Sequence, residues 1–190
     1  MHQTGLRLAL VGTAALLVGA ATLPDPTRSD IAASSFAASG LVAEGITVEA
    51  TWPVSPDEAF ALMTDPTAWK EHFQLQTNID LAIGGRFELL FGAGAEPPAP
   101  VGSQGSEGCQ ILSYIPGEML SFSWNAPPSF EERAQHTWVV ITFSPGAEGG
   151  TTNLRLRHVG FGEGGRWSEV QAYFEAAWPR LLGAMASDLE

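Results

Sequence analysis

The sequence predicts an α+β domain in which a curved antiparallel sheet packs on one long C-terminal helix. Residues 167–189 repeat apolar side chains at helical spacing and so form one broad stripe along a helix. Residues 47–161 instead read as short strands, with two brief helices near their start. A single long helix after many strands can bury its stripe only against their sheet. The stripe consists of Val170, Tyr173, Phe174, Ala177, Leu181, Leu182, Met185 and Leu189.

The first elements follow from alternation and from helix caps. Residues 46–54 alternate well enough to predict a first strand. Ser55 then marks a helix start, because Pro56 can take the first helical position and Glu58 can close a capping box. Asp65 and the proline after it repeat this signal and open a second short helix.

Six further strand-like segments bring the sheet to about six or seven strands. They are residues 77–83, 86–91, 109–115, 119–124, 137–143 and 152–159. Gly84-Gly85 and Pro116-Gly117 predict turns between two pairs of them. Residues 92–105 and 125–135 form longer connections, and the first exceeds most hairpin loops.

The final helix contains a proline. Pro179 removes a backbone donor and crowds the carbonyl group of Glu175, which costs about 3 kcal/mol in a straight helix. We therefore expect a kink or a restart of the helix near Trp178.

Composition excludes several classes of function. The apolar fraction of 45% is enough for a packed core. The formal net charge of -12 argues against nucleic acid and anionic lipid as partners, since phosphate groups would be repelled. Cys109 is the only cysteine, which excludes an internal disulfide and a zinc site built from cysteines.

The N-terminal residues indicate targeting. Residues 1–23 carry Arg7 and then an uncharged apolar run, as in a signal peptide or an N-terminal anchor. Residues 24–43 are small and polar and predict a flexible linker before a folded domain over residues 44–190. We expect a cleaved signal and hence an exported protein, periplasmic or extracellular. The alternative is an uncleaved segment that tethers the protein to the membrane.

Six stretches of the sequence carry a family resemblance. They are VSPDEAFALMTDPTAWKEHF (54–73), IGGRFEL (83–89), YIPGEMLSFSW (114–124), VVITFSP (139–145), TTNLRLRHVGF (151–161) and YFEAAWPRLLGAM (173–185). In this order they resemble the START-like, or SRPBCC, superfamily with its helix-grip fold. Within it the chain is similar to the activator of heat-shock protein 90 ATPase homologue-like family. A cytosolic co-chaperone has no use for a secretory signal, so the name of the family is a poor guide to function here.

The resemblance implies a cavity between the sheet and the long helix that holds apolar or aromatic small molecules. A sheet that curls over a helix leaves an interior lined by alternate strand residues, which leads to the same expectation. The alternative for each aromatic side chain is that it simply fills the core. The candidate cavity residues are Phe87, Leu89, Leu120, Phe122, Trp124, Trp138, Leu156, His158, Phe174 and Trp178.

His158 is the most informative polar candidate. It alternates with Leu154 and Leu156 on the apolar face of its strand, where it could orient a ligand or act as an acid or base. The alternative is a core histidine that is hydrogen-bonded to backbone. The sequence contains no GxSxG motif, no phosphate-binding GxxxxGK[ST] loop and no ligand spacing for a metal, so we expect no metal and no cofactor.

Three functions therefore stay open at this stage. The first is a module that binds a hydrophobic small molecule. The second is a cyclase/aromatase- or hydrolase-like enzyme that uses the same cavity, with His158 as an acid-base residue beside a glutamate or tyrosine. The third is a protein-interaction module of the co-chaperone kind. A cavity without paired titratable groups favours the first, a cavity with His158 beside a carboxylate or tyrosine the second, and a filled core the third.

Overall fold

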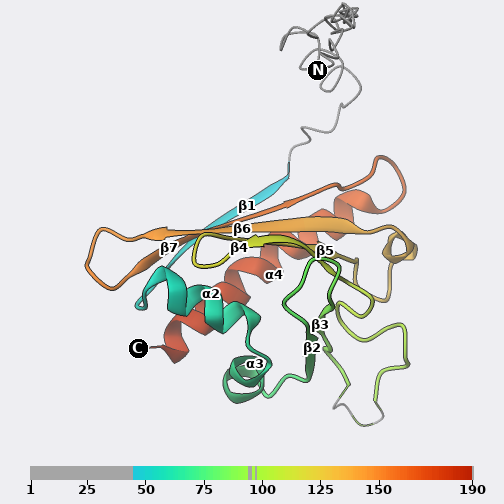
Figure 1. Cartoon of the computed structure of the whole chain (residues 1–190). Helices are drawn as coiled ribbons and strands as arrows, with labels where there is room; N and C mark the ends of the chain where they lie inside the picture. Colours follow the sequence, from blue (N-terminus) through green and yellow to red (C-terminus); the bar gives the residue numbers. More distant parts are fainter. Residues whose placement is uncertain (1–44, 94–95, 97, 190) are drawn as a thin grey trace, which may run out of the picture. The chain divides into compact units, whose positions relative to one another are not determined.

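The computed structural model describes residues 45–93, 96 and 98–189, which belong to one compact unit over Leu41–Glu190. The predicted leader (1–23) and linker (24–43) lie outside the described residues. In chain order the elements are β1 (Ile46–Trp52), α2 (Pro56–Thr64), α3 (Pro66–Phe73), β2 (Thr77–Ile79), β3 (Phe87–Leu89), β4 (Ile111–Ile115), β5 (Met119–Trp124), the 3₁₀ helix η1 (Glu131–Ala134), β6 (Thr137–Pro145), β7 (Thr152–Val159) and α4 (Trp167–Asp188) (Figure 1).

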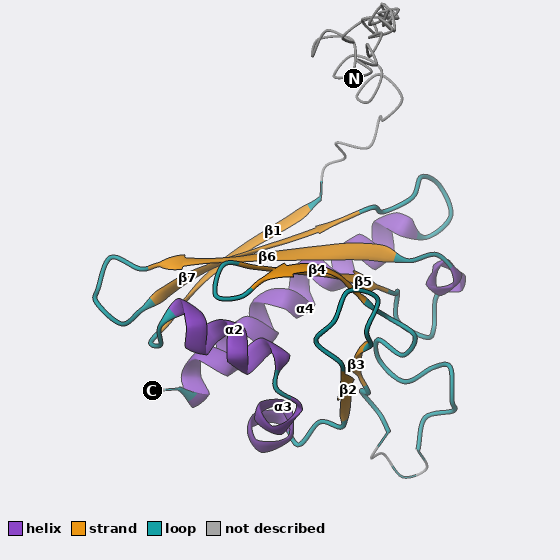
Figure 2. Cartoon of the chain, in the orientation of Figure 1, coloured by secondary structure: helices purple, strands orange, loops and turns teal. Residues whose placement is uncertain are grey.

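Five strands form one antiparallel sheet in the order β1-β7-β6-β5-β4. The helix α4 lies along one face of this sheet, and α2 and α3 lie on the same side (Figure 2). This is the predicted α+β helix-grip architecture. No helix within residues 45–93, 96 and 98–189 combines the length and apolar character that a membrane span requires.

The predicted single sheet of six or seven strands needs a correction, because β2 and β3 form a separate two-stranded sheet. The two strands are also shorter than predicted, since the chain turns between Asp80 and Arg86. A bridge from Arg86 to Gln110, with a backbone hydrogen bond from Phe87 N–H to the carbonyl oxygen of Cys109 at 2.9 Å beside it, joins this hairpin to the segment before β4. The amide of Leu89 donates instead to Oγ of Ser106 at 2.8 Å, so a loop takes the place of a neighbouring strand.

Local capping explains the two short helices, as the sequence predicts. Glu58 N–H donates to Oγ of Ser55 at 3.4 Å, and Ser55 N–H donates to Oε2 of Glu58 at 2.9 Å, which completes a capping box. At the start of α3, Thr67 N–H donates to Oδ1 of Asp65 at 2.8 Å.

The helix α4 runs without interruption through Pro179, so the predicted restart of the helix does not occur. Pro179 and Glu175 are both exposed, so the carbonyl group that loses its helical partner lies on the solvent side. The opposite face is buried against the sheet, and Trp52 Nε1–H donates to the carbonyl oxygen of Leu182 at 3.1 Å. Tertiary packing therefore outweighs the local cost of the proline.

The inner face of the sheet is set by the alternation along β6 and β7. Leu154, Leu156 and His158 point inward from β7, as predicted. On β6 the inward residues include Thr137 and Val139, so Trp138 between them lies on the outer face and is 37% exposed. The prediction that Trp138 lines an interior cavity is therefore wrong.

Candidate functional site: a pocket between the C-terminal helix and two loops

A pocket of about 230 Å³ lies where one face of α4 meets two loops and the end of β5. The loops are the two long connections recognised in the sequence. Among the described residues, none of those that line the pocket carries a charge. The lining residues are Phe91, Ser103, Gly105, Trp124, Asn125, Ala126, Pro127, Pro128, Tyr173, Phe174, Ala177, Trp178 and Leu181.

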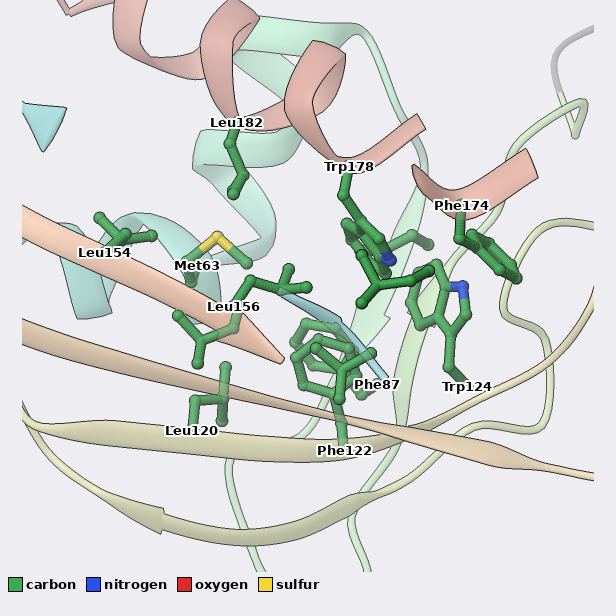
Figure 3. Close-up of a cluster of buried hydrophobic side chains, with 14 of the residues drawn as sticks. Met63, Phe87, Leu120, Phe122, Trp124, Leu154, Leu156, Phe174, Trp178 and Leu182 are labelled. Carbon is green, nitrogen blue, oxygen red and sulfur yellow. The ribbon is translucent and has the colours of Figure 1, made fainter. Parts of the chain in front are cut away.

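The residues on the α4 side of the pocket share one face of the helix because of their spacing. Positions 173, 177 and 181 follow one another at four-residue intervals, and 174 and 178 lie beside them on the same face. The ring of Trp178 lies 5.1 Å from that of Trp124 and 6.1 Å from that of Phe174, measured between centroids. Figure 3 shows these three rings gathered on one side of the buried cluster. Tyr173 is 48% exposed and so forms part of the rim.

The loop side of the pocket combines apolar side chains with the polar side chains of Ser103 and Asn125. Pro127 and Pro128 have no backbone N–H group to offer a ligand. Gly105 adopts φ +51°, and a Cβ atom there would collide with the carbonyl oxygen of Leu89. Only glycine therefore allows this loop to approach β3 so closely. Phe91, 43% exposed, also forms part of the rim.

Three of the predicted cavity residues line this pocket: Trp124, Phe174 and Trp178. Five others do not line it and instead fill a packed core, which we define as Phe87, Leu89, Leu120, Phe122 and Leu156; each is at most 1% exposed. Within this core the ring centroids of Phe87 and Phe122 stand 4.0 Å apart in a stacked arrangement (Figure 3). For these five positions the alternative interpretation, a filled core, is correct, because the β2–β3 hairpin covers the sheet there.

The prediction did not include several pocket residues: Phe91, Tyr173, Leu181, Pro127 and Pro128. Two signals pointed to them. Connections as long as residues 92–105 and 125–135 are uncommon in compact domains and are often functional. Positions 173 and 181 also belong to the apolar stripe of α4, and lie at the edge of its buried face.

His158 is fully buried behind the pocket and takes part in a continuous chain of hydrogen bonds. Trp178 Nε1–H donates to Nδ1 of His158 at 3.0 Å. Because Nδ1 is an acceptor, Nε2 carries the proton and donates to Oγ1 of Thr137 at 2.7 Å. The Thr137 hydroxyl group in turn donates to the carbonyl oxygen of Trp124 at 3.2 Å. These hydrogen bonds thus link Trp178 to Trp124, the two tryptophans of the pocket wall.

Burial lowers the pKa of His158 to about 3, so the imidazole is neutral at neutral pH. Its ring contacts those of Phe161 and Phe174, with centroids 4.5 and 4.7 Å away. Among the described residues, no carboxylate or tyrosine hydroxyl group forms a hydrogen bond or ion pair with it. This environment suits a core histidine that holds its neighbours, rather than an acid-base residue.

Two further kinds of site, a reactive cysteine and a metal-binding cluster, do not occur in the part of the chain that the structure describes. Burial raises the pKa of the Cys109 thiol to about 12, which keeps it protonated and unreactive. No cluster of three or more histidine, cysteine, aspartate or glutamate side chains that could hold a metal ion occurs among these residues.

Comparison with known proteins identifies relatives of the fold. A family model described as "Activator of Hsp90 ATPase homolog 1-like protein" matches residues 53–190. No curated protein sequence matches the chain significantly.

Solved structures match most of the chain at low sequence identity. Protein MLL2253 from Mesorhizobium loti is 20% identical with a TM-score of 0.59, and the match covers 76% of this chain and 95% of that one. CalU16 from Micromonospora echinospora is 22% identical with a TM-score of 0.55, over 77% and 76%. PFC0360w, an HSP90 activator from Plasmodium falciparum, is 17% identical with a TM-score of 0.54, over 73% and 89%. At these identities the likeness shows a shared fold.

Proposed function

This chain belongs to the Activator of Hsp90 ATPase homolog 1-like protein family, and we propose that its domain binds an uncharged aromatic or apolar small molecule. The observation that supports this proposal is a pocket lined by two tryptophans, two phenylalanines and two prolines, with no charged side chain among the described lining residues. Such a concave, apolar surface with few polar groups is the usual form of a small-molecule site.

The size of the pocket suits a small ring system. Its volume of about 230 Å³ exceeds that of an engineered cavity of about 150 Å³ that binds benzene. Trp124, Phe174 and Trp178 offer ring faces and edges against which a planar ligand can stack. The net charge of -12 further favours a neutral ligand over an anionic one.

The enzyme hypothesis has less support, because it requires an ionisable pair beside the pocket. Both ring nitrogens of His158 are occupied by Trp178 and Thr137, and its pKa is lowered well below neutral pH. The protein-interaction hypothesis remains the second candidate. Phe91 and Tyr173 are exposed aromatic side chains that a protein partner could cover as well as a ligand.

Two substitutions that replace an alanine of α4 by phenylalanine test the proposed site. Ala177 lines the pocket, whereas Ala172 is exposed on another face of the same helix. We expect Ala177→Phe to fill the pocket and weaken binding of the neutral fluorescent probe N-phenyl-1-naphthylamine about tenfold or more. Ala172→Phe adds the same ring without entering the pocket, so it should bind like the natural chain.

Two results would count against the proposal. One is that the natural chain does not bind the probe. The other is that the Ala177→Phe and Ala172→Phe variants bind it equally well. Native mass spectrometry of the purified domain supplies an independent test, because a co-purified small molecule would identify the ligand class directly. Either negative result would make the protein-interaction hypothesis the better one.

We also propose that the protein is exported, on the basis of the apolar run that follows Arg7 in the sequence. Fractionation of cells that carry the intact chain tests this proposal. We expect the protein outside the cytoplasm, and an unprocessed chain in the soluble cytosolic fraction would contradict it.

A further inference from the structure

We propose that Glu132 and Arg133, neighbours in η1, are positioning residues that hold the loop wall of the pocket and so set its affinity for ligands. This inference rests on the proposed function. Neither residue lines the pocket, and each reaches a different part of its surroundings.

Arg133 joins the two loops of the pocket wall. Its Nη1 group donates to the carbonyl oxygen of Ala126 at 2.6 Å and to Oδ1 of Asn125 at 3.1 Å. Its Nη2 group donates to the carbonyl oxygen of Gly105 at 2.8 Å, and Nε donates to that of Gly102 at 3.1 Å. Three of these four partner residues line the pocket. One rigid guanidinium group therefore fixes the spacing between the loops.

The hydrogen bonds of the Arg133 guanidinium group all go to these four acceptors among the described residues. No carboxylate group there lies within ion-pair distance of it, although Arg86, Arg155 and Arg166 each pair with one. The side chain is half-buried, and burial lowers its pKa. Charge-assisted bonds to carbonyl groups in such a setting are stronger than neutral ones. Arg133 is thus placed to organise backbone rather than to balance a surface charge.

Glu132 joins the segment 125–135, which contains η1, to the start of α4. The N-cap residue Arg166 makes no capping bond with its own side chain, and its N–H group donates to Oε1 of Glu132 at 2.6 Å. A carboxylate at this position satisfies an open donor and interacts favourably with the helix dipole. Gly165 permits the approach, since a Cβ atom there would lie 2.6 Å from Oε1 of Glu132.

Arg166 strengthens the connection from the side of the helix. Its Nη1 group donates to the carbonyl oxygen of Ser129 at 3.3 Å, and its guanidinium group lies 4.3 Å from the ring centroid of Phe130. The segment 125–135 is therefore held on one side by the 102–105 loop and on the other by α4. Since α4 and these two loops together enclose the pocket, η1 sets the distance between its walls.

Matched arginine substitutions test this role. We expect Arg133→Met to weaken binding of N-phenyl-1-naphthylamine about tenfold, because four hydrogen bonds that hold the loops are lost. Arg157→Met removes the same charge from the exposed face of β7 and should change binding by less than about twofold. Arg133→Lys should fall between them, since a lysine cannot reach all four acceptors at once. Equal binding by the Arg133→Met and Arg157→Met variants would overturn the proposal.

Substitutions of Glu132 give a second test that does not depend on Arg133. Glu132→Gln keeps an oxygen for the Arg166 amide and should bind the probe almost as well as the natural chain. Glu132→Ala removes the acceptor and should weaken binding about threefold to tenfold. A glutamine variant that binds as poorly as the alanine variant would contradict the capping role.

Hydrogen exchange separates failure of this inference from failure of the proposed function. With no probe present, Arg133→Met should speed amide exchange in the 102–106 and 129–135 segments and leave the five-stranded sheet unchanged. Arg157→Met should leave both segments unchanged. If the natural chain binds no probe, the proposed function fails, and this exchange pattern alone decides whether Arg133 positions the loops. Unchanged exchange in both segments would overturn the positioning role.

Discussion

Phe122 and Trp124 lie two residues apart on β5 and face the same side of the sheet, but their surroundings differ. Phe122 stacks on Phe87 at 4.0 Å between ring centroids and is 1% exposed. Trp124 borders the pocket and contacts Trp178, which also lines it, at 5.1 Å between ring centroids. The β2–β3 hairpin covers the sheet at Phe122, and β3 ends at Leu89. Beyond that point loops take the place of the hairpin beside α4, and they leave a space that is lined by both.

The comparison teaches that aromatic content does not distinguish a core from a pocket. Both regions contain large rings on the inner face of one sheet. What differs is the element that covers them, regular structure in one case and loops held by Arg133 in the other. Mutations in the two regions should therefore have different consequences for stability.

The largest expected effect is at the packed core. Phe122→Ala removes a buried ring that contacts those of Phe87 and Trp124, so a cavity remains after the substitution. We expect a loss of about 3–5 kcal/mol in the free energy of unfolding. Urea denaturation followed by tryptophan fluorescence measures it. A loss below about 1.5 kcal/mol would show that this region is not tightly packed.

A smaller loss is expected for Trp178→Ala, although the removed ring is larger. One side of that ring already borders the pocket, so fewer contacts are lost. We expect about 2–3 kcal/mol, part of it from the unpaired Nδ1 atom of His158. The same denaturation experiment compares the two variants directly. A larger loss for Trp178→Ala than for Phe122→Ala would remove the distinction between the regions.

His158, which lies between the pocket and the packed core, should make the free energy of unfolding depend on pH. Its pKa is lowered by burial from the ordinary value of 6.5 to about 3 in the folded state, so below pH 6.5 the unfolded chain binds more protons. Stability should therefore fall as the pH drops from 6.5 toward 3, by at most about 1.4 kcal/mol for each pH unit. Well above pH 6.5 the protonation of this histidine should no longer change stability with pH.

The comparison of pH 6.5 with pH 5 isolates this effect from the carboxylates. Glu58, Glu132 and Glu169 have lowered pKa values, so their contributions are lost only at more acidic pH. His158→Phe should remove most of the change in unfolding free energy between these two pH values. An unchanged pH dependence in this variant would show that His158 is not the group responsible.

The smallest effect is expected on the outer face of the sheet. Trp138 lies there, 37% exposed, with its ring over Gly160. We expect Trp138→Ala to cost about 1 kcal/mol or less and to leave probe binding unchanged. A loss as large as that of Trp178→Ala would contradict the assignment of Trp138 to the outer face.

The sequence by itself determined the features that depend on neighbours close along the chain. The caps at Ser55 and Asp65, the alternation along β7 and the apolar stripe of α4 all depend on residues within about one or two turns of one another. These local rules were enough for an α+β domain with its sheet on one long helix, and the family resemblance added the helix-grip fold. They were also enough to bring Trp124, Phe174 and Trp178 together in one predicted set.

Only the tertiary structure decided which end of the helix–sheet interface is hollow and what His158 does there. The partners of His158 are 20 and 21 residues away, and those of Arg133 in the other loop are 28 and 31 residues away. Spacing along the chain holds no information about such contacts, because they depend on how loops return to the sheet. Tertiary packing likewise decided that α4 continues through Pro179, since the burial of its inner face outweighs one lost hydrogen bond.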